Sequence, residues 1–240
     1  MKNLRSHTTL LLVVAGFLYS SWPLGYWLNP QADHGLASNL EALHQPYNWA
    51  FILFDITSGV LICVAAKELF AVSARNISHR TSLGLGVAIV GTATFGLFTA
   101  VDAVTPLDCM EGSPHCVAPL HNPYFLIHGI FSIGSIAGLT VSIVAIWLLL
   151  FLREQAVNSL AHLTPAMFLI VWVGFGVLTL YLILHHQTSG VAQHLFIAFC
   201  SLWLMTFPYF VRLVIRLQPP IKCESLPFIS DNQCVARREA

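Results

Sequence analysis

Long apolar runs recur along this sequence and are separated by short polar stretches. A membrane-spanning helix needs about 20 consecutive apolar residues. Six runs are of about that length, at about residues 8–28, 48–66, 82–104, 123–152, 165–185 and 191–217. The pattern predicts an all-α fold over residues 1–217, an integral membrane bundle of six transmembrane helices, followed by a short polar cytoplasmic tail at 218–240.

The composition agrees with this pattern. The chain is 56% hydrophobic and only 9% charged, whereas a soluble domain carries about a quarter charged residues. Such a chain cannot cover itself with water-facing side chains, but it suits a bundle whose outside contacts lipid. The formal net charge is zero. A nucleic-acid partner is therefore not indicated, and membrane lipid is the expected surrounding.

The first apolar run has two interpretations. Lys2 and Arg5 precede it, as the basic residues of a signal peptide would. However, no clear small-x-small cleavage site follows. The run ends instead in the aromatic stretch Trp22-Pro23-Leu24-Gly25-Tyr26-Trp27, which is typical of a membrane interface. We therefore expect a retained helix.

The basic residues predict the orientation in the membrane. They are Lys2, Arg5, Lys67, Arg75, Arg80, Arg153, Arg212, Arg216, Lys222, Arg237 and Arg238. With six spans and both termini in the cytoplasm, all eleven fall on the cytoplasmic side, and the outer loops contain none. Since cytoplasmic loops carry an excess of Lys and Arg, the sequence predicts an N-in, C-in topology.

Local signals mark helix ends and helix contacts. Asn122-Pro123 and Thr164-Pro165 each predict an N-cap followed by the first helical residue. Pro23 and Pro208 are expected to kink the helices that contain them, because each removes a backbone hydrogen bond. The spacing Gly134-xxx-Gly138 predicts close packing against a neighbouring helix.

Two cysteines, Cys109 and Cys116, fall in the outer loop between the third and fourth segments. An oxidising compartment favours disulfides, so the topology predicts a bond between this pair. The alternative is a redox-active pair. Membrane thiol oxidoreductases usually carry Cys-x-x-Cys, which is absent here.

Acids and histidines gather on the same outer side. Eight of the eleven histidines lie there, and Asp55 and Asp102 lie within predicted helices. Ionisable groups at membrane depth are costly unless they pair or line water. Ser132 follows His128 by four residues, so both lie on one helix face. We expect an outward pocket that brings together Asp55, Asp102, His128, Ser132 and His194.

Two kinds of chemistry fit such a pocket. Two or three histidines with a carboxylate can hold Zn²⁺ with an open position for water. The metal would generate a hydroxide nucleophile, and an aspartate would act as general base or orient a metal-bound histidine. Alternatively, the buried aspartates and histidines form structural hydrogen-bonded pairs.

The motif Asp102-x-x-x-Pro106-x-Asp108-Cys109, with Cys116, His121 and His128 after it, resembles the domain-of-unknown-function 998 family of bacterial membrane proteins. The resemblance is strongest over about residues 95–140. It implies a six- to seven-helix bundle in a bacterial inner membrane and no settled activity.

A fainter similarity, of chemistry alone, is to the seven-helix hydrolases that include alkaline ceramidases. These use three histidines, an aspartate and a serine around zinc. The analogy assigns His128, His186 and His194 to the metal, and Asp102 and Ser132 to catalysis, with Asp55 as a further catalytic candidate. This chain departs from that pattern, because it has six segments and lacks a paired His-xxx-His in its last helix.

Three functional hypotheses remain open. The first is a metal-dependent hydrolase of a lipid or lipid-linked substrate. The second is a non-enzymatic transporter, sensor or assembly partner that uses the Asp and His residues for protons. The third is a redox protein that holds haem between two histidines, for instance His128 and His194.

Overall fold

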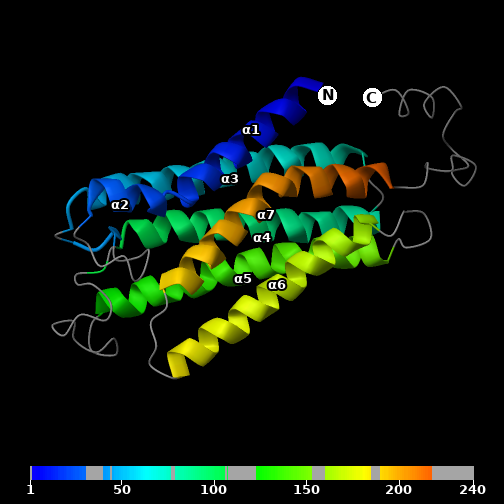
Figure 1. Ribbon diagram of the computed structural model, residues 1–240. Helices are drawn as coiled ribbons and strands as arrows, with labels where there is room; N and C mark the ends of the chain where they lie inside the picture. The colour runs from blue at the N-terminus through cyan, green and yellow to red at the C-terminus, as the bar shows by residue number, and fades with distance from the viewer. Residues whose placement is uncertain are drawn as a thin grey trace, which may run out of the picture.

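The computed structural model describes residues 2–30, 40–43, 45–76, 79–105, 107, 123–152, 160–184 and 190–217 (Figure 1). Over these residues the chain is helical and contains no strand, which confirms the all-α prediction for this part of the chain. The elements are α1 (Lys2–Tyr19), the 3₁₀ helix η1 (Trp22–Leu24), α2 (Gly25–Leu28), α3 (Asn48–Asn76), α4 (His79–Ala103), α5 (Pro123–Phe151), α6 (Leu160–Leu184) and α7 (Gly190–Arg216).

Five stretches of the described chain are long and apolar enough to cross a membrane. They are Ser6–Leu28, Asn48–Ser73, Thr81–Ala103, Pro123–Phe151 and Ala192–Arg216. Their outward surfaces are apolar as well: on α3, for example, Leu53, Val60 and Val64 are exposed. Apolar side chains on the outside of a helical bundle are suited to lipid contact. The chain is an integral multi-pass membrane protein.

The sixth predicted segment, 165–185, corresponds to α6 (Leu160–Leu184). Within the residues whose side chains are described, its apolar stretch runs only from Ala166 to Leu178, shorter than a span. The helix already begins at Leu160, so the expected start at Thr164-Pro165 is wrong. Pro165 is the sixth residue of α6 and removes the hydrogen bond that a backbone N–H there would donate to the carbonyl of Ala161.

Two further helix ends differ from the expected ones. The first segment is not one helix over 8–28, because α1 ends at Tyr19 and Pro23 stands in the first turn of η1. Pro23 therefore helps to start a new turn and does not kink α1. The helix expected over 48–66 continues to Asn76 in α3. Hydropathy marks only the apolar part of a helix, and α3 extends past it through Lys67 and Glu68.

The predicted close approach of glycines is present. In Figure 1, α3, α4 and α5 run side by side, and α4 packs on both of its neighbours. A Cβ on Gly138 would lie 2.8 Å from the carbonyl oxygen of Gly91, and a Cβ on Gly91 would lie 2.6 Å from that of Gly138. Gly59 of α3 and Gly96 of α4 make a second contact of this kind. In lipid, no hydrophobic effect drives two helices together. Small residues therefore stabilise the bundle by letting the helix backbones pack closely.

Hydrogen bonds also join the helices inside the bundle. The hydroxyls of Thr92 in α4 and Ser142 in α5 are 2.9 Å apart. The indole N–H of Trp203 in α7 donates to Ser142 over 3.3 Å. All three side chains are buried. They therefore fix the relative positions of three helices where water cannot replace a lost bond.

The two ends of the bundle carry different groups. The beginning of α1 and the end of α7 lie at the same end (Figure 1). There, Thr8 donates to Glu68 over 2.7 Å, and Arg212 donates to Thr9. At the other end, residues 40–43 meet the segment after α4 through a bond of 2.7 Å from the N–H of Leu43 to the carbonyl of Leu107. This contact holds the 40–43 segment over the ends of α3 and α4.

Candidate functional site: an acidic pocket

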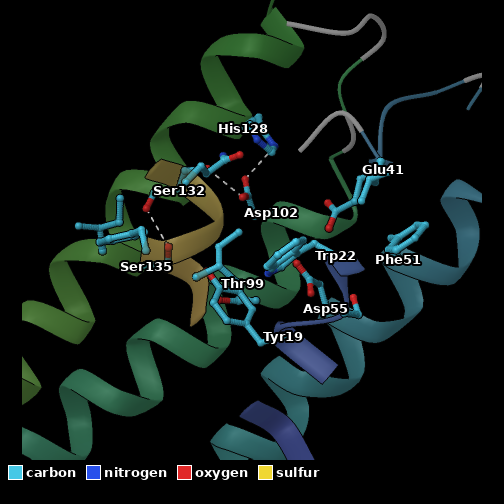
Figure 2. Close-up of a pocket in the computed structure, with 16 residues that line it drawn as sticks. Tyr19, Trp22, Glu41, Phe51, Asp55, Thr99, Asp102, His128, Ser132 and Ser135 are labelled. Atoms are coloured by element: carbon cyan, nitrogen blue, oxygen red, sulfur yellow. Dashed lines mark hydrogen bonds and ion pairs between the residues drawn. The ribbon is translucent and has the colours of Figure 1, made fainter. Parts of the chain in front are cut away.

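A cavity of about 140 Å³ lies at the end of the bundle where α3, α5 and α7 begin and α4 ends (Figure 2). An engineered apolar cavity of about 150 Å³ holds one benzene molecule, so this pocket accepts only a small ligand. Its lining combines acids, hydroxyls and aromatic rings: Tyr19, Ser21, Trp22, Leu40, Glu41, Phe51, Asp55, Thr99, Asp102, His128, Ser132, Ser135, Ile136, Gln193, Phe196 and Ile197.

The wall made by α4 and α5 carries three predicted site residues in contact. Nδ1 of His128 lies 3.0 Å from Oδ1 of Asp102, and the Ser132 hydroxyl donates to Oδ2 of the same carboxylate over 2.9 Å. Ser135 in turn donates to the backbone carbonyl of Ser132 over 2.8 Å. Asp102 ends α4, and His128 and Ser132 stand one turn apart near the start of α5. The four-residue spacing therefore turns both side chains towards the acid.

The geometry around Ser132 centres on the carboxylate of Asp102. The Ser132 hydroxyl donates to this carboxylate, which can itself act as a base, and His128 contacts its other oxygen. The arrangement is that of an aspartate held by two neighbours, which fixes the orientation of the imidazole. Asp102 and His128 are both mostly buried, with 20% and 12% of their side chains exposed.

A second acidic pair lies on the opposite wall and includes a residue that sequence reasoning missed. The buried carboxyl groups of Glu41 and Asp55 interact across the cavity lining. Two carboxyl groups so close together attract each other only when one of them carries a proton. Burial raises the pKa of the Glu41 carboxyl and the charge of Asp102 raises it further, although the interaction with Asp55 and the nearby His128 act in the opposite direction.

Glu41 was missed because it belongs to a loop between predicted helices. One signal was present in the sequence: it stands between Leu40 and Ala42, both of which are buried in the structure. Apolar neighbours in a short polar stretch indicate that the stretch folds against the protein. The segment therefore brings its acid inward rather than to the surface.

Two lining groups that take no part in the contact between Asp102 and His128 have polar atoms without a hydrogen-bond partner among the described residues. They are Nε1 of Trp22 and the hydroxyl of Thr99. Thr99 is only 4% exposed and stands three residues before Asp102, on the same face of α4. Figure 2 shows the indole of Trp22 between Thr99 and Asp55. Sequence reasoning assigned Trp22 to an aromatic belt and did not single out Thr99.

The predicted site residues divide into three groups. Asp55, Asp102, His128 and Ser132 line the pocket. His194 is buried, and its ring stacks on that of Trp22 with centroids 4.1 Å apart and planes 8° apart. The remaining residues, His186, Cys109 and Cys116, lie outside the described residues, so the disulfide stays a prediction.

The metal hypothesis also stays a prediction. Within the part of the chain that the structure describes, no three His, Cys, Asp or Glu side chains are grouped closely enough to hold a metal ion. One of the three expected ligands, His186, lies outside that part. Zinc content measured in the purified protein, beside a His128→Ala variant, would test the assignment.

Comparison with known proteins identifies a family for most of the chain. The family described as "Protein of unknown function (DUF998)" matches residues 12–207. The matched range includes every residue that lines the pocket. No curated protein and no solved structure matches the chain.

Proposed function

Because the chain belongs to the family described as protein of unknown function (DUF998), which brings no reaction with it, we propose a role from the pocket itself. The protein is a proton-linked transporter or sensor that binds a small ligand without converting it. Of the three hypotheses raised by the sequence, this is the one that the arrangement of acids and hydroxyls supports best.

The observation that carries the proposal is the grouping of Glu41 and Asp55 in one cavity lining with Asp102 and His128. A pair of carboxyl groups that shares one proton changes its charge when a charged ligand arrives, because neighbouring charge shifts carboxyl ionisation. Proton release or uptake is then coupled to ligand binding.

We further propose six spans, with both termini in the cytoplasm and the pocket open to the opposite side. Lys67 stands twelve residues after Asp55 in α3, about 18 Å further along the helix. Arg212 and Arg216 stand near the end of α7, whereas the pocket residues Gln193, Phe196 and Ile197 stand near its start. The positive-inside rule supports this orientation.

The other two hypotheses have less support. Of the three metal ligands expected for the hydrolase, His128 lines the pocket and His194 stacks on Trp22, while His186 lies outside the described residues. Haem is a much larger group than benzene, and a cavity of about 140 Å³ holds only a molecule of about benzene size. In addition, the ring of His194, one of the two expected haem ligands, stacks on Trp22.

Infrared spectroscopy tests the shared proton directly. We expect the carbonyl band of a protonated carboxyl group in the detergent-purified protein at neutral pH. The band disappears in a Glu41→Gln, Asp55→Asn double variant, because neither position can then hold a carboxyl proton. A Glu68→Gln variant at the opposite end of the bundle is the control and keeps the band. A wild-type protein without this band would overturn the proposal.

A further inference from the structure

We infer that the pocket binds a compact amine that also carries a neutral oxygen, an amino alcohol being the simplest case, and that its ammonium group displaces the proton shared by Glu41 and Asp55. The inference names a ligand class for the proposed function and rests on it. It is carried by the charge, the aromatic lining, the unpartnered polar atoms and the size of the cavity.

The charge of the lining favours a cation. Three carboxyl groups, those of Glu41, Asp55 and Asp102, face the cavity, and the described part of its lining includes no Lys or Arg. His128 can balance Asp102 at 3.0 Å. The pair of Glu41 and Asp55 keeps one negative charge even when it holds one proton. A positive ligand is therefore attracted whether the pair holds its proton or has released it, whereas an anion would meet only repulsion.

The aromatic lining fits the same ligand. Tyr19, Trp22, Phe51 and Phe196 contribute rings to the cavity wall. Aromatic faces attract cations, and the attraction grows when water is excluded. The rings also limit the number of waters that compete for the carboxylates. An ammonium group is therefore better accommodated here than at an exposed acidic surface.

The polar atoms of Trp22 and Thr99 that have no partner indicate that the ligand carries a polar group besides its ammonium group. The indole N–H of Trp22 can only donate, and the hydroxyl of Thr99 can donate or accept. Neither has a partner among the described residues. A polar group buried without a partner is unfavourable, and Thr99 is only 4% exposed. An oxygen on the ligand would accept from Trp22 and exchange a bond with Thr99, while the ammonium group faces the acids.

The volume of the cavity limits the ligand to small amines. The cavity of about 140 Å³ accepts a molecule of about benzene size. Ethanolamine is smaller than benzene and carries both required groups. Choline is larger, and its quaternary nitrogen has no N–H to donate to a carboxylate. The inference therefore predicts primary over quaternary amines.

The proton balance follows from the groups around the pair. The titratable side chains that line the cavity are Glu41 before α3, Asp55 on α3, Asp102 on α4, His128 on α5 and Tyr19 on α1. From α7, Gln193 is neutral, and His194 stacks on Trp22. An arriving ammonium ion favours the ionised form of both carboxyl groups in the pair, so one proton leaves as one ligand enters.

Titration calorimetry with the full chain in detergent tests the inference, using ethanolamine, n-propylamine, choline and acetate as probes. We expect ethanolamine to bind with release of up to one proton, detected by a pH indicator in weak buffer. Its affinity should fall by up to tenfold per pH unit on acidification. Propylamine should bind more weakly because it has no oxygen, and choline and acetate should not bind.

Two variants separate the parts of the site. Thr99→Val removes the hydroxyl at nearly constant volume and should lower ethanolamine affinity severalfold, with propylamine affinity unchanged. Asp55→Asn should abolish proton release. Glu68→Gln, at the other end of the bundle, is the control and should bind like the wild type. Ethanolamine binding that is unchanged in both Thr99→Val and Asp55→Asn would overturn the inference.

The same ammonium and oxygen chemistry occurs in the ethanolamine headgroup of a lipid. Nanodiscs that contain either ethanolamine-headgroup or choline-headgroup lipid distinguish the two sources. If the ethanolamine lipid alone shifts the protonated-carboxyl band and blocks the free amine, the headgroup is the ligand. If neither the free amines nor the lipids bind or shift the infrared band, and the band is present, the inference on the ligand is wrong. The shared proton of the proposed function is then still supported by the band.

Discussion

Nδ1 of His128 lies 3.0 Å from Oδ1 of Asp102, and this contact joins the end of α4 to the beginning of α5. The contact between the two side chains adds to the glycine contacts that hold α4 against α5. The hydroxyl of Ser132 holds the second oxygen of the same carboxylate at 2.9 Å. The acid is thus fixed from two positions on α5.

Replacing Asp102 should destabilise the protein more than removing the hydroxyl of Ser132. Asp102→Asn keeps an acceptor for Ser132 but turns an N–H₂ group towards His128, so we expect the free energy of unfolding to fall by about 1–3 kcal/mol. Ser132→Ala should lower it by about 1 kcal/mol. Thermal unfolding in detergent measures both. An Asp102→Asn variant as stable as Ser132→Ala would show that the contact with His128 contributes little.

The glycine contact between α4 and α5 predicts a position-dependent effect of alanine. Gly138→Ala places a Cβ 2.8 Å from the Gly91 carbonyl oxygen. Such overpacking should destabilise the protein by about 1–3 kcal/mol. Gly129→Ala on the same helix is the matched control, because its Cβ would meet nothing within 4 Å. Its stability should stay equal or rise by up to about 1 kcal/mol. Equal unfolding temperatures for the two variants would contradict the close approach.

The buried Ser142 should contribute more to the stability of the protein than the size of its side chain suggests. Ser142→Ala removes the acceptor of the Trp203 indole N–H and the partner of Thr92. We expect a loss of about 1–3 kcal/mol, because a buried donor is left unsatisfied. The control is Thr206→Val on α7, whose hydroxyl bonds only to carbonyls of its own helix. If both variants unfold alike, the bonds between helices are not a stabilising element.

The raised pKa of Glu41 predicts how stability depends on pH. The unfolded state loses this proton near the ordinary glutamate pKa of about 4.3, while the folded state keeps it to higher pH. The unfolded state therefore binds fewer protons in that window, and stability falls as pH rises from about 4.3 to the folded pKa. In Glu41→Gln this part of the pH dependence should vanish. Unfolding temperatures measured from pH 4 to pH 8 check the sign, and a variant with the wild-type slope would refute it.

Sequence reasoning identified Asp55, Asp102, His128 and Ser132 as pocket residues but missed Glu41, Thr99 and Trp22. Asp102, His128 and Ser132 were identifiable because a polar residue within an apolar helix is costly, and a spacing of four gives a common face. Glu41 depends on how a loop folds back over two helix ends, and hydropathy carries no information on that. Thr99 and Trp22 are ordinary residues for a membrane helix and its interface. Their role arises only from which side chains meet across helices.

Some helix ends were also predictable from the sequence, and others were not. The beginning of α5 at Pro123 was predictable, because proline favours the first helical position. The break after Tyr19 was not, since an apolar stretch continues through it. Hydropathy records which residues prefer lipid, whereas helix termination depends on local backbone geometry and packing.

The two backbone contacts of α4, Gly59 with Gly96 on one side and Gly91 with Gly138 on the other, have a mechanical consequence. Direct contact between main chains leaves no flexible side chain to absorb sliding, so α3, α4 and α5 should move as one rigid scaffold. Gly16 of α1 makes a looser contact with α7, through the side chain of Met205 and, 3.0 Å from a Cβ placed on Gly16, the carbonyl oxygen of Ser201, and methionine adapts its shape readily. Any opening of the pocket should therefore come from α1 and α7 shifting against that scaffold.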